Sequence, residues 1–180
     1  MTLPGATIRF PRGPRAFTLV ELMTVVLIVG ILAATAIPAF GTLSSSRRAA
    51  AAKEVARFLL VARSCALASG RPTGVKFDAG SALTIVNIPT PGAPPGAMID
   101  PLGQPEPTIA LPGLFNGVNV ESVVLGDSTS GNVTLWFAYD GTPQTRTSSG
   151  TLGSAWVKDA TITFTGNATL TVRRGSGLIE

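Results

Sequence analysis

The sequence contains no histidine and a single cysteine, Cys65, among its 180 residues. An intrachain disulfide, a zinc cluster with cysteine or histidine ligands and a histidine-based catalytic dyad are therefore excluded. Charged residues are also scarce, at 13% of the chain. A single cysteine on an apolar face is most often a packing residue, and we interpret Cys65 in this way.

The positive charge of the chain is concentrated near its N-terminus. The formal net charge is +4, and Arg9, Arg12 and Arg15 all precede a long apolar segment. From Gly41 onward, 11 Lys and Arg face 9 Asp and Glu, which leaves +2. This balance is too small to predict a polyanionic partner from net charge.

The apolar segment from Ala16 to Phe40 carries one charged residue, Glu21. Leu22 to Phe40 are 19 uncharged residues. In a helix they would span roughly 28 Å, close to the thickness of one hydrocarbon core. We therefore expect a membrane anchor. An ionised side chain at the centre of such a helix costs about 2.5 to 3.5 kcal/mol, and less near an end, so Glu21 needs a partner.

Two ordinary interpretations of this segment stay open. A secretory signal could be cleaved after the small residues Ala34 to Ala36, but apolar character resumes from Ile37 to Phe40, and Glu21 stands where the apolar core should begin. A plain single-span anchor is the second interpretation. Basic residues on both sides of the segment leave its orientation undecided.

The third interpretation rests on a resemblance. The run Ala16 to Glu21 (AFTLVE), followed by the apolar segment and Pro38, resembles the class III signal of type IV pilins and type II secretion pseudopilins. The resemblance implies cleavage by a prepilin peptidase between Ala16 and Phe17, and N-methylation of Phe17. It also implies that Glu21 neutralises the N-terminal ammonium of a neighbouring subunit, so that neither charge is buried alone. The family prefers glycine before the cut, where this chain has Ala16.

The helix is predicted to continue beyond the apolar segment. Pro38 lacks an amide hydrogen, so we expect a kink there. Gly70 and Pro72 predict an end near Ser69. One apolar stripe follows helical spacing and should be buried: Val55, Phe58, Leu59, Ala62 and Ala66. Three basic residues are interpreted as a solvated face: Lys53, Arg57 and Arg63.

After the helix the pattern changes to strands. Six are predicted: Thr73–Phe77, Ala82–Ile88, Val118–Leu125, Val133–Tyr139, Thr161–Thr165 and Ala168–Arg173. Gly166-Asn167 is a clear hairpin turn. Pro89 to Gly113 contains eight prolines and is predicted to be a long surface loop.

The predicted fold is α+β, with a long pilin-like N-terminal helix, transmembrane and then amphipathic, docked on an antiparallel β-sheet or β-sandwich head. Its parts are a prepilin leader (1–16), a transmembrane and assembly half of the helix (17–40), an amphipathic half (41–69) and a periplasmic β-rich head (70–180). The head includes the Pro-rich loop 89–113.

The amphipathic half is similar to that of the GspH/FimT group of minor pilins and H-type pseudopilins, in which a helix of the form L-x-x-A-R-S-x-A leads to G-R-P. Here the resemblance is carried by Ser46 to Arg48, Glu54 to Arg57, Leu60 to Ser64 and Gly70 to Pro72. The resemblance implies an H-type minor pseudopilin in the periplasmic pseudopilus of a type II secretion system. It implies a single-pass inner-membrane protein with a cytoplasmic N-terminus and a periplasmic head. Its partners would be other pseudopilins or pilins, the prepilin peptidase, the inner-membrane assembly platform and the lipid bilayer.

The alternative within the resemblance is a FimT-like minor type IV pilin for pilus biogenesis or DNA uptake. Arg173 and Arg174 are the candidates for a DNA contact. They lack the Gly-Arg-x-Arg pattern of DNA-binding members and have no stacking aromatic residue near them, which argues against DNA as a partner.

Other classes of function have little support. No nucleophile and base stand at a recognisable spacing, so an enzyme is not expected, nor is a cofactor. No acid-rich loop suggests a metal site. A membrane-anchored periplasmic binding protein is a remote alternative, because the Pro-rich loop with Trp136 or Trp156 could form a shallow site. Trp136 is interpreted as core, and Trp156 is left open.

Overall fold

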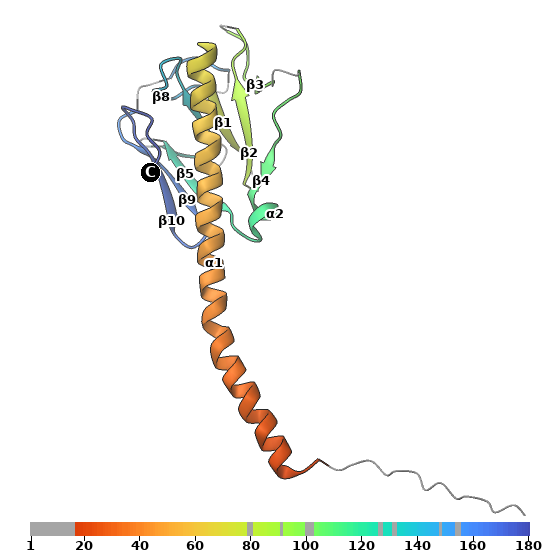
Figure 1. Cartoon of the computed structure of the whole chain (residues 1–180). Helices are drawn as coiled ribbons and strands as arrows, with labels where there is room; N and C mark the ends of the chain where they lie inside the picture. Colours follow the sequence, from red (N-terminus) through yellow and green to blue (C-terminus); the bar gives the residue numbers. More distant parts are fainter. Residues whose placement is uncertain are drawn as a thin grey trace, which may run out of the picture. The chain divides into compact units, whose positions relative to one another are not determined.

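The computed structural model describes residues 17–78, 81–90, 92–99, 103–125, 128–130, 133–147, 149–153 and 156–180, without the side chains of 35–40 and 128–130. The chain divides into two compact units, Met1–Thr42 and Leu43–Glu180. The described part of the first unit is helical from Leu19 onward, and the second combines helix with antiparallel strands (Figure 1). The predicted α+β class is confirmed.

The main helix, α1, spans Leu19–Ser69. It begins after Thr18, whose side-chain oxygen Oγ1 accepts a hydrogen bond of 3.2 Å from the amide of Glu21, as an N-cap residue does. It ends at Ser69, and Gly70 after it has a φ of 64°, a left-handed conformation that glycine adopts without strain. The predicted end near Ser69 is therefore confirmed.

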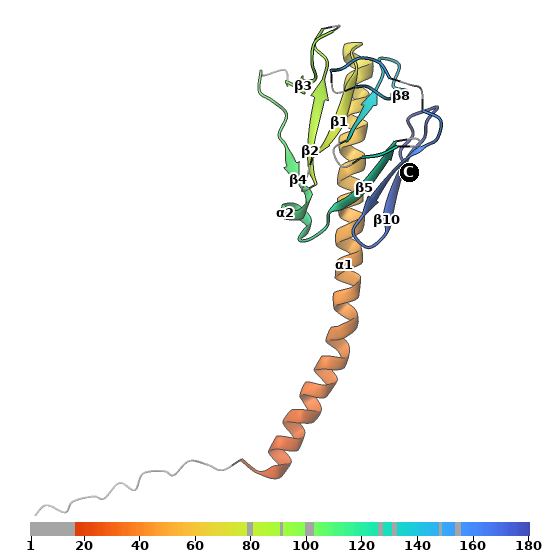
Figure 2. The same cartoon turned by 180° about the vertical axis from the view of Figure 1, so that it is seen from behind.

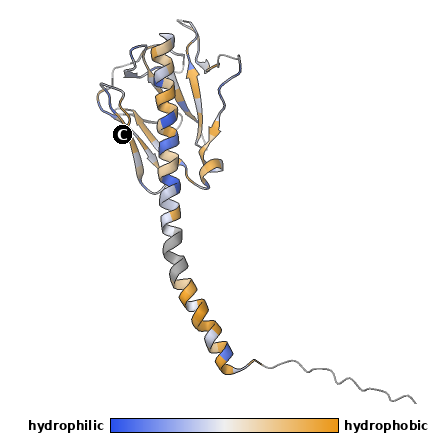
Figure 3. Cartoon of the chain, in the orientation of Figure 1, coloured by the Kyte–Doolittle hydropathy of each residue, from blue (hydrophilic) through white to orange (hydrophobic). Residues whose placement is uncertain are grey.

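In the unit Leu43–Glu180, one face of α1 enters the hydrophobic core. All five residues of the predicted stripe are buried, and Ala51 extends the stripe by one turn. Figures 1 and 2 show this part of α1 lying across strands of two sheets. The stripe is apolar because it packs against the inner sides of both sheets, and the opposite face of the helix carries the charged residues (Figure 3).

The first sheet has the strand order β3-β2-β1-β7-β8, with β4 also paired to β2. Its strands are β1 (Thr73–Asp78), β2 (Ala82–Asn87), β3 (Gly96–Ala97), β4 (Ile109–Ala110), β7 (Val133–Phe137) and β8 (Pro143–Gln144). Val75 of the central strand faces Ile85 on one side and Leu135 on the other, and all three side chains are buried. The first predicted hairpin, β1 with β2, is confirmed.

The second sheet has the order β10-β9-β5-β6. Its strands are β5 (Val120–Leu125), β6 (Ser128–Ser130), β9 (Ala160–Phe164) and β10 (Ala168–Val172). The predicted terminal hairpin is confirmed, and both Gly166 and Asn167 of its turn have positive φ. Buried Ser81 connects the two sheets, since its Oγ accepts a 2.8 Å hydrogen bond from the amide of Val120.

The Pro-rich segment differs from the predicted loop. It contributes the short strands β3 and β4 and leads into a five-residue helix, α2 (Leu111–Phe115), whose Leu111 is fully buried. The prolines permit this because two-residue strands fit between them, and Pro112 stands in the first turn of α2, where no amide hydrogen is needed.

The basic face of α1 also differs from its prediction. Lys53 and Arg57 are exposed, and Arg57 pairs with Glu54 at 2.6 Å. Arg63 is not solvated in this way. Its Nε donates to the carbonyl of Gly141 at 3.1 Å and its Nη2 donates to the carbonyl of Ser176 at 2.7 Å. A single side chain of α1 thus holds two loops of the head.

The two tryptophans lie in different places. Trp136 is 2% exposed and packs with Val86 and Ile88 in a small cluster separate from the main core. Its interpretation as a buried residue is confirmed. Trp156, which the sequence left open, belongs to the main core at 8% exposure.

Candidate functional site

The N-terminal part of α1 has an apolar surface that nothing in the described chain covers. All twelve large apolar side chains from Phe17 to Leu32 are more than half exposed, from 51% for Val25 and Ile28 to 78% for Phe17. Extended exposed apolar surface marks a site that contacts another protein or a membrane. Figure 3 shows this part of α1 mostly in the apolar colour, with one hydrophilic band near its start.

Within the part of the chain that the structure describes, no helix combines the length and the apolar character needed to cross a membrane. The predicted span includes residues 35–40, whose side chains lie outside that part.

Glu21 occupies the first turn of α1. Thr18 and Glu21 have the spacing of a capping box, in which a threonine at the N-cap is followed three residues later by glutamate. Of the two hydrogen bonds in that arrangement, the structure has the one from the Glu21 amide to Thr18 Oγ1. A negative charge in the first turn also complements the positive end of the helix dipole. The T-x-x-E pattern is therefore a local signal for the start of the helix at Thr18, which the sequence-based interpretation missed.

The predicted processing site lies at the edge of the described residues. Ala16 is outside them. Phe17 is the first described residue and precedes the start of α1 by two positions. Cleavage between Ala16 and Phe17 and methylation of Phe17 therefore stay predictions. The same holds for the kink at Pro38, because α1 continues through that position but its side chain is not described.

The two C-terminal arginines are engaged within the head. Arg173 forms ion pairs of 3.0 Å with both Asp159 and Glu180. The amide of Arg174 donates to Asp159 at 2.8 Å, and its guanidinium donates to the carbonyl of Val157. Hydrogen bonds from the Arg174 amide and the Arg173 side chain hold the pKa of Asp159 below its usual value. The positive charge of Arg173 is thus offset by two carboxylates of the same chain.

The Pro-rich segment and Trp136 do meet at one cavity. A pocket of about 600 Å³ on the first sheet is lined by Pro94, Pro95, Trp136 and Arg146, among others. Trp136 is nevertheless 2% exposed, so its indole offers little surface to a sugar or a peptide. Trp156 does not line this pocket.

Potential metal ligands and the single thiol are candidate reactive groups among the described residues. No cluster of three or more potential metal ligands is found in that part of the chain. Burial raises the pKa of the half-buried Cys65 thiol, with a smaller contribution from the charge of Glu106. A raised pKa keeps the thiol protonated and weakly nucleophilic, as suits a packing residue.

Comparison with known proteins agrees with the N-terminal pattern. Residues 11–37 match the family described as the prokaryotic N-terminal methylation motif. No curated protein and no solved structure matches the chain. The match supports a type IV pilin-like protein with a class III signal, and such a signal implies processing by a prepilin peptidase and pilin-type assembly.

Proposed function

We propose that this chain is an H-type minor pseudopilin that assembles into the periplasmic pseudopilus of a type II protein secretion system. Its role is structural rather than catalytic. The observation that carries the proposal is the set of twelve exposed apolar side chains that follows a prepilin-type signal. A helix that is apolar on all sides requires an apolar environment, first the inner membrane and then neighbouring helices of a filament.

In this proposal Glu21 has two successive roles. In the single chain it belongs to the first turn of α1, beside the cap at Thr18. In the filament it pairs with the methylated ammonium of Phe17 on a neighbouring subunit. A carboxylate among apolar helices is costly unless an opposite charge accompanies it, and this pairing requires the leader to be removed first.

The head supports the narrower assignment to the GspH/FimT group through the motif in α1. Leu59, Ala62 and Ala66 of the L-x-x-A-R-S-x-A form are fully buried in the core. Arg63 of the same form joins the loops at Gly141 and Ser176. Every fixed position of the motif except Ser64 is thus either buried in the core or hydrogen-bonded to a loop of the head. These contacts give a structural reason for this motif to occur together with this kind of head.

A role in DNA uptake has less support. The candidate DNA contact Arg173 already pairs with Asp159 and Glu180, and DNA phosphates would have to compete with those carboxylates. We therefore favour secretion over the FimT-like alternative.

Two experiments test the proposal. Mass spectrometry of the membrane fraction should identify a mature chain that begins with N-methylated Phe17, whereas a chain beginning at Ile37 would show that the segment is an ordinary secretory signal. Deletion of the gene should reduce the release of exoproteins while twitching motility and transformation continue. Loss of transformation with normal exoprotein release would instead favour the DNA-uptake alternative.

A further inference from the structure

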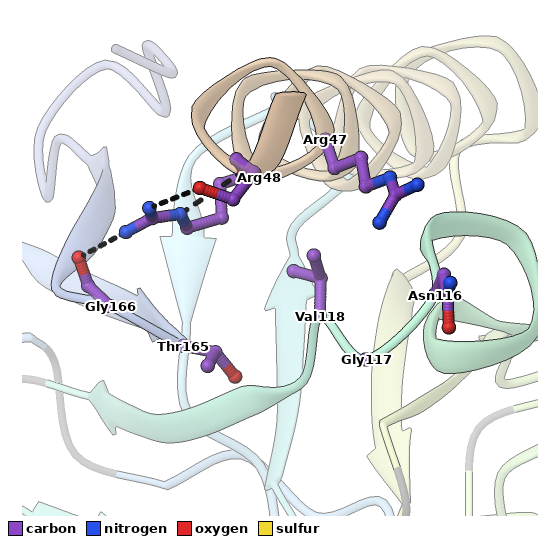
Figure 4. A pocket seen from close by; sticks show the side chains of 8 residues that line it. Arg47, Arg48, Asn116, Gly117, Val118, Thr165 and Gly166 are labelled. Carbon is purple, nitrogen blue, oxygen red and sulfur yellow. Dashed lines mark hydrogen bonds between the residues drawn. The ribbon is translucent and has the colours of Figure 1, made fainter. Parts of the chain in front are cut away.

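A surface pocket lies where α1 meets two loops of the head. Its volume is about 340 Å³. Arg47 and Arg48 of α1 form one wall, residues 116–118 form the second, and the hairpin turn at Thr165 and Gly166 forms the third (Figure 4). No aspartate or glutamate lines it. The pocket therefore has two positive charges and no negative one in its lining.

Arg48 is held in place. Its Nε and Nη2 donate to the carbonyl and hydroxyl of Ser44, both at 3.2 Å, and its Nη1 donates to the carbonyl of Gly166 at 3.0 Å. A side chain at position 166 would collide with Nη1, so Arg48 could keep this position only beside a glycine. All three acceptors are neutral oxygens, so none of these contacts pairs Arg48 with a carboxylate.

Arg47 has no such support. Its side chain makes no hydrogen bond and no ion pair with any residue that the structure describes, although the residue is half-buried. Figure 4 shows it extending from α1 on the side of Asn116, while Arg48 extends toward Gly166, with Val118 below and between the two. A half-buried cation without an acceptor is a donor group available to a ligand.

We propose that the pocket formed by Arg47, Arg48 and residues 116–118 binds a phosphate group, supplied by the headgroup of an anionic phospholipid. Guanidinium groups donate in a planar fork that matches phosphate oxygens, and charge-assisted hydrogen bonds of this kind are the strong ones. Val118, at 5% exposure, closes the floor of the pocket between the two arginines and brings no polar group to it. The pocket volume is near the lower end of the range for small ligand sites.

The choice of a lipid rests on the proposed membrane anchor. Arg47 follows Phe40, the last residue of the apolar segment, by seven positions. Seven residues span about 10 Å in a helix and about 25 Å when fully extended. If residues 17–40 lie in the bilayer, the pocket must lie near the headgroups, where basic side chains attract anionic lipids.

The test uses the full-length chain in a neutral detergent, with bound lipid measured by native mass spectrometry. Three probes are titrated: phosphatidylglycerol, dioleoylglycerol, which lacks the phosphate, and inorganic phosphate. We expect phosphatidylglycerol to bind at least tenfold more tightly than dioleoylglycerol. Arg47→Gln should weaken phosphatidylglycerol binding about tenfold by removing the free donor. Lys53→Gln, which removes the same charge from an exposed position of the same helix, should leave it unchanged.

Each other outcome overturns part of the proposal. Equal binding of phosphatidylglycerol and dioleoylglycerol, or an equal loss in Arg47→Gln and Lys53→Gln, would overturn the pocket as a phosphate site. Binding of inorganic phosphate as tight as that of phosphatidylglycerol would overturn the assignment to lipid. Trp136 and Trp156 fluorescence shows whether the head of each variant is folded. Because these measurements need neither processing nor assembly, their failure is distinct from a failure to find methylated Phe17.

Discussion

Two stretches of α1 carry many apolar side chains but differ in how far those side chains are buried. From Phe17 to Leu32 every large apolar side chain is more than half exposed, whereas the stripe from Ala51 to Ala66 is almost fully buried. The second stretch buries one face against the sheets of the head, and its other face is polar (Figure 3). The first stretch has no polar face to turn toward water. The second stretch is thus covered by other parts of its own chain, whereas the first exposes an apolar surface that the described residues do not cover.

The largest expected effect concerns Glu21. Glu21→Ala should leave the chain membrane-inserted and processed but reduce its incorporation into filaments at least tenfold, because the neighbouring ammonium would be buried unpaired. Glu21→Gln is the matched control: glutamine is also accepted at this position of a capping box and has nearly the same shape, but it removes the charge. Both variants should fail equally when co-purification with filaments is measured. Normal assembly of Glu21→Gln would show that the helix cap, and not charge pairing, is what matters.

The second prediction tests the buried stripe of α1 by substitution of two adjacent leucines. Leu59 is fully buried and Leu60 is 49% exposed. Leu59→Ala should lower the free energy of unfolding of the head by about 2 to 5 kcal/mol, since it leaves a cavity in the core. Leu60→Ala should change it by less than about 0.5 kcal/mol. Tryptophan fluorescence during denaturation measures this for the head alone, because both tryptophans lie in it. Equal losses in the free energy of unfolding at both positions would contradict the burial of only one face of this part of α1.

The third test concerns the polar link between the stripe and the loops. Arg63→Ala removes the hydrogen bonds to the carbonyls of Gly141 and Ser176. Hydrogen bonds to charged groups contribute about 1.5 to 3 kcal/mol each at most, and partial exposure reduces this, so we expect a loss of about 1 to 3 kcal/mol in the same assay. Arg71→Ala, at an exposed arginine whose side chain makes no hydrogen bond with the described residues, is the control. If the head of Arg63→Ala were as stable as the wild type, the hydrogen bonds from Arg63 would not contribute to the stability of the head.

The smallest effect is a pH dependence at the end of the head. The pKa of Asp159 is lowered from its ordinary value of 3.8 by hydrogen bonds from the Arg174 amide and the Arg173 side chain. A lowered folded-state pKa means that the ion pair stabilises the head above pH 3.8 and that this contribution is lost as the pH falls below it. Asp159→Asn should therefore be slightly less stable than the wild type at pH 7, and the difference should shrink below pH 3.8. A constant difference across this range would contradict the pairing.

Much of the fold follows from local patterns. The end of α1 at Ser69, the buried stripe and the two hairpins were predicted because helical spacing, Gly and Pro signals and strand alternation involve residues close together in the chain. The Pro-rich segment was predicted less well. Its prolines exclude a long ladder, but two-residue strands beside β2 depend on a partner that only the folded sheet supplies.

In the candidate site, too, local features could be predicted from the sequence and long-range contacts could not. The AFTLVE run and the apolar segment after it are contiguous, so the sequence alone predicted the prepilin-type signal and the need for an apolar environment. The engagement of Arg173 by Asp159, 14 residues away, could not be predicted in the same way.

By itself, the sequence determined the N-terminal signal, the long helix with its two kinds of apolar surface, and the antiparallel strands. Only the tertiary structure decided that Arg63 joins two loops that lie 78 and 113 residues away. It also decided that Arg48 reaches a turn 118 residues away, while the Arg47 side chain bonds to none of the described residues. Periodicity and turn chemistry act over a few residues, whereas these contacts depend on how the sheets and the helix pack.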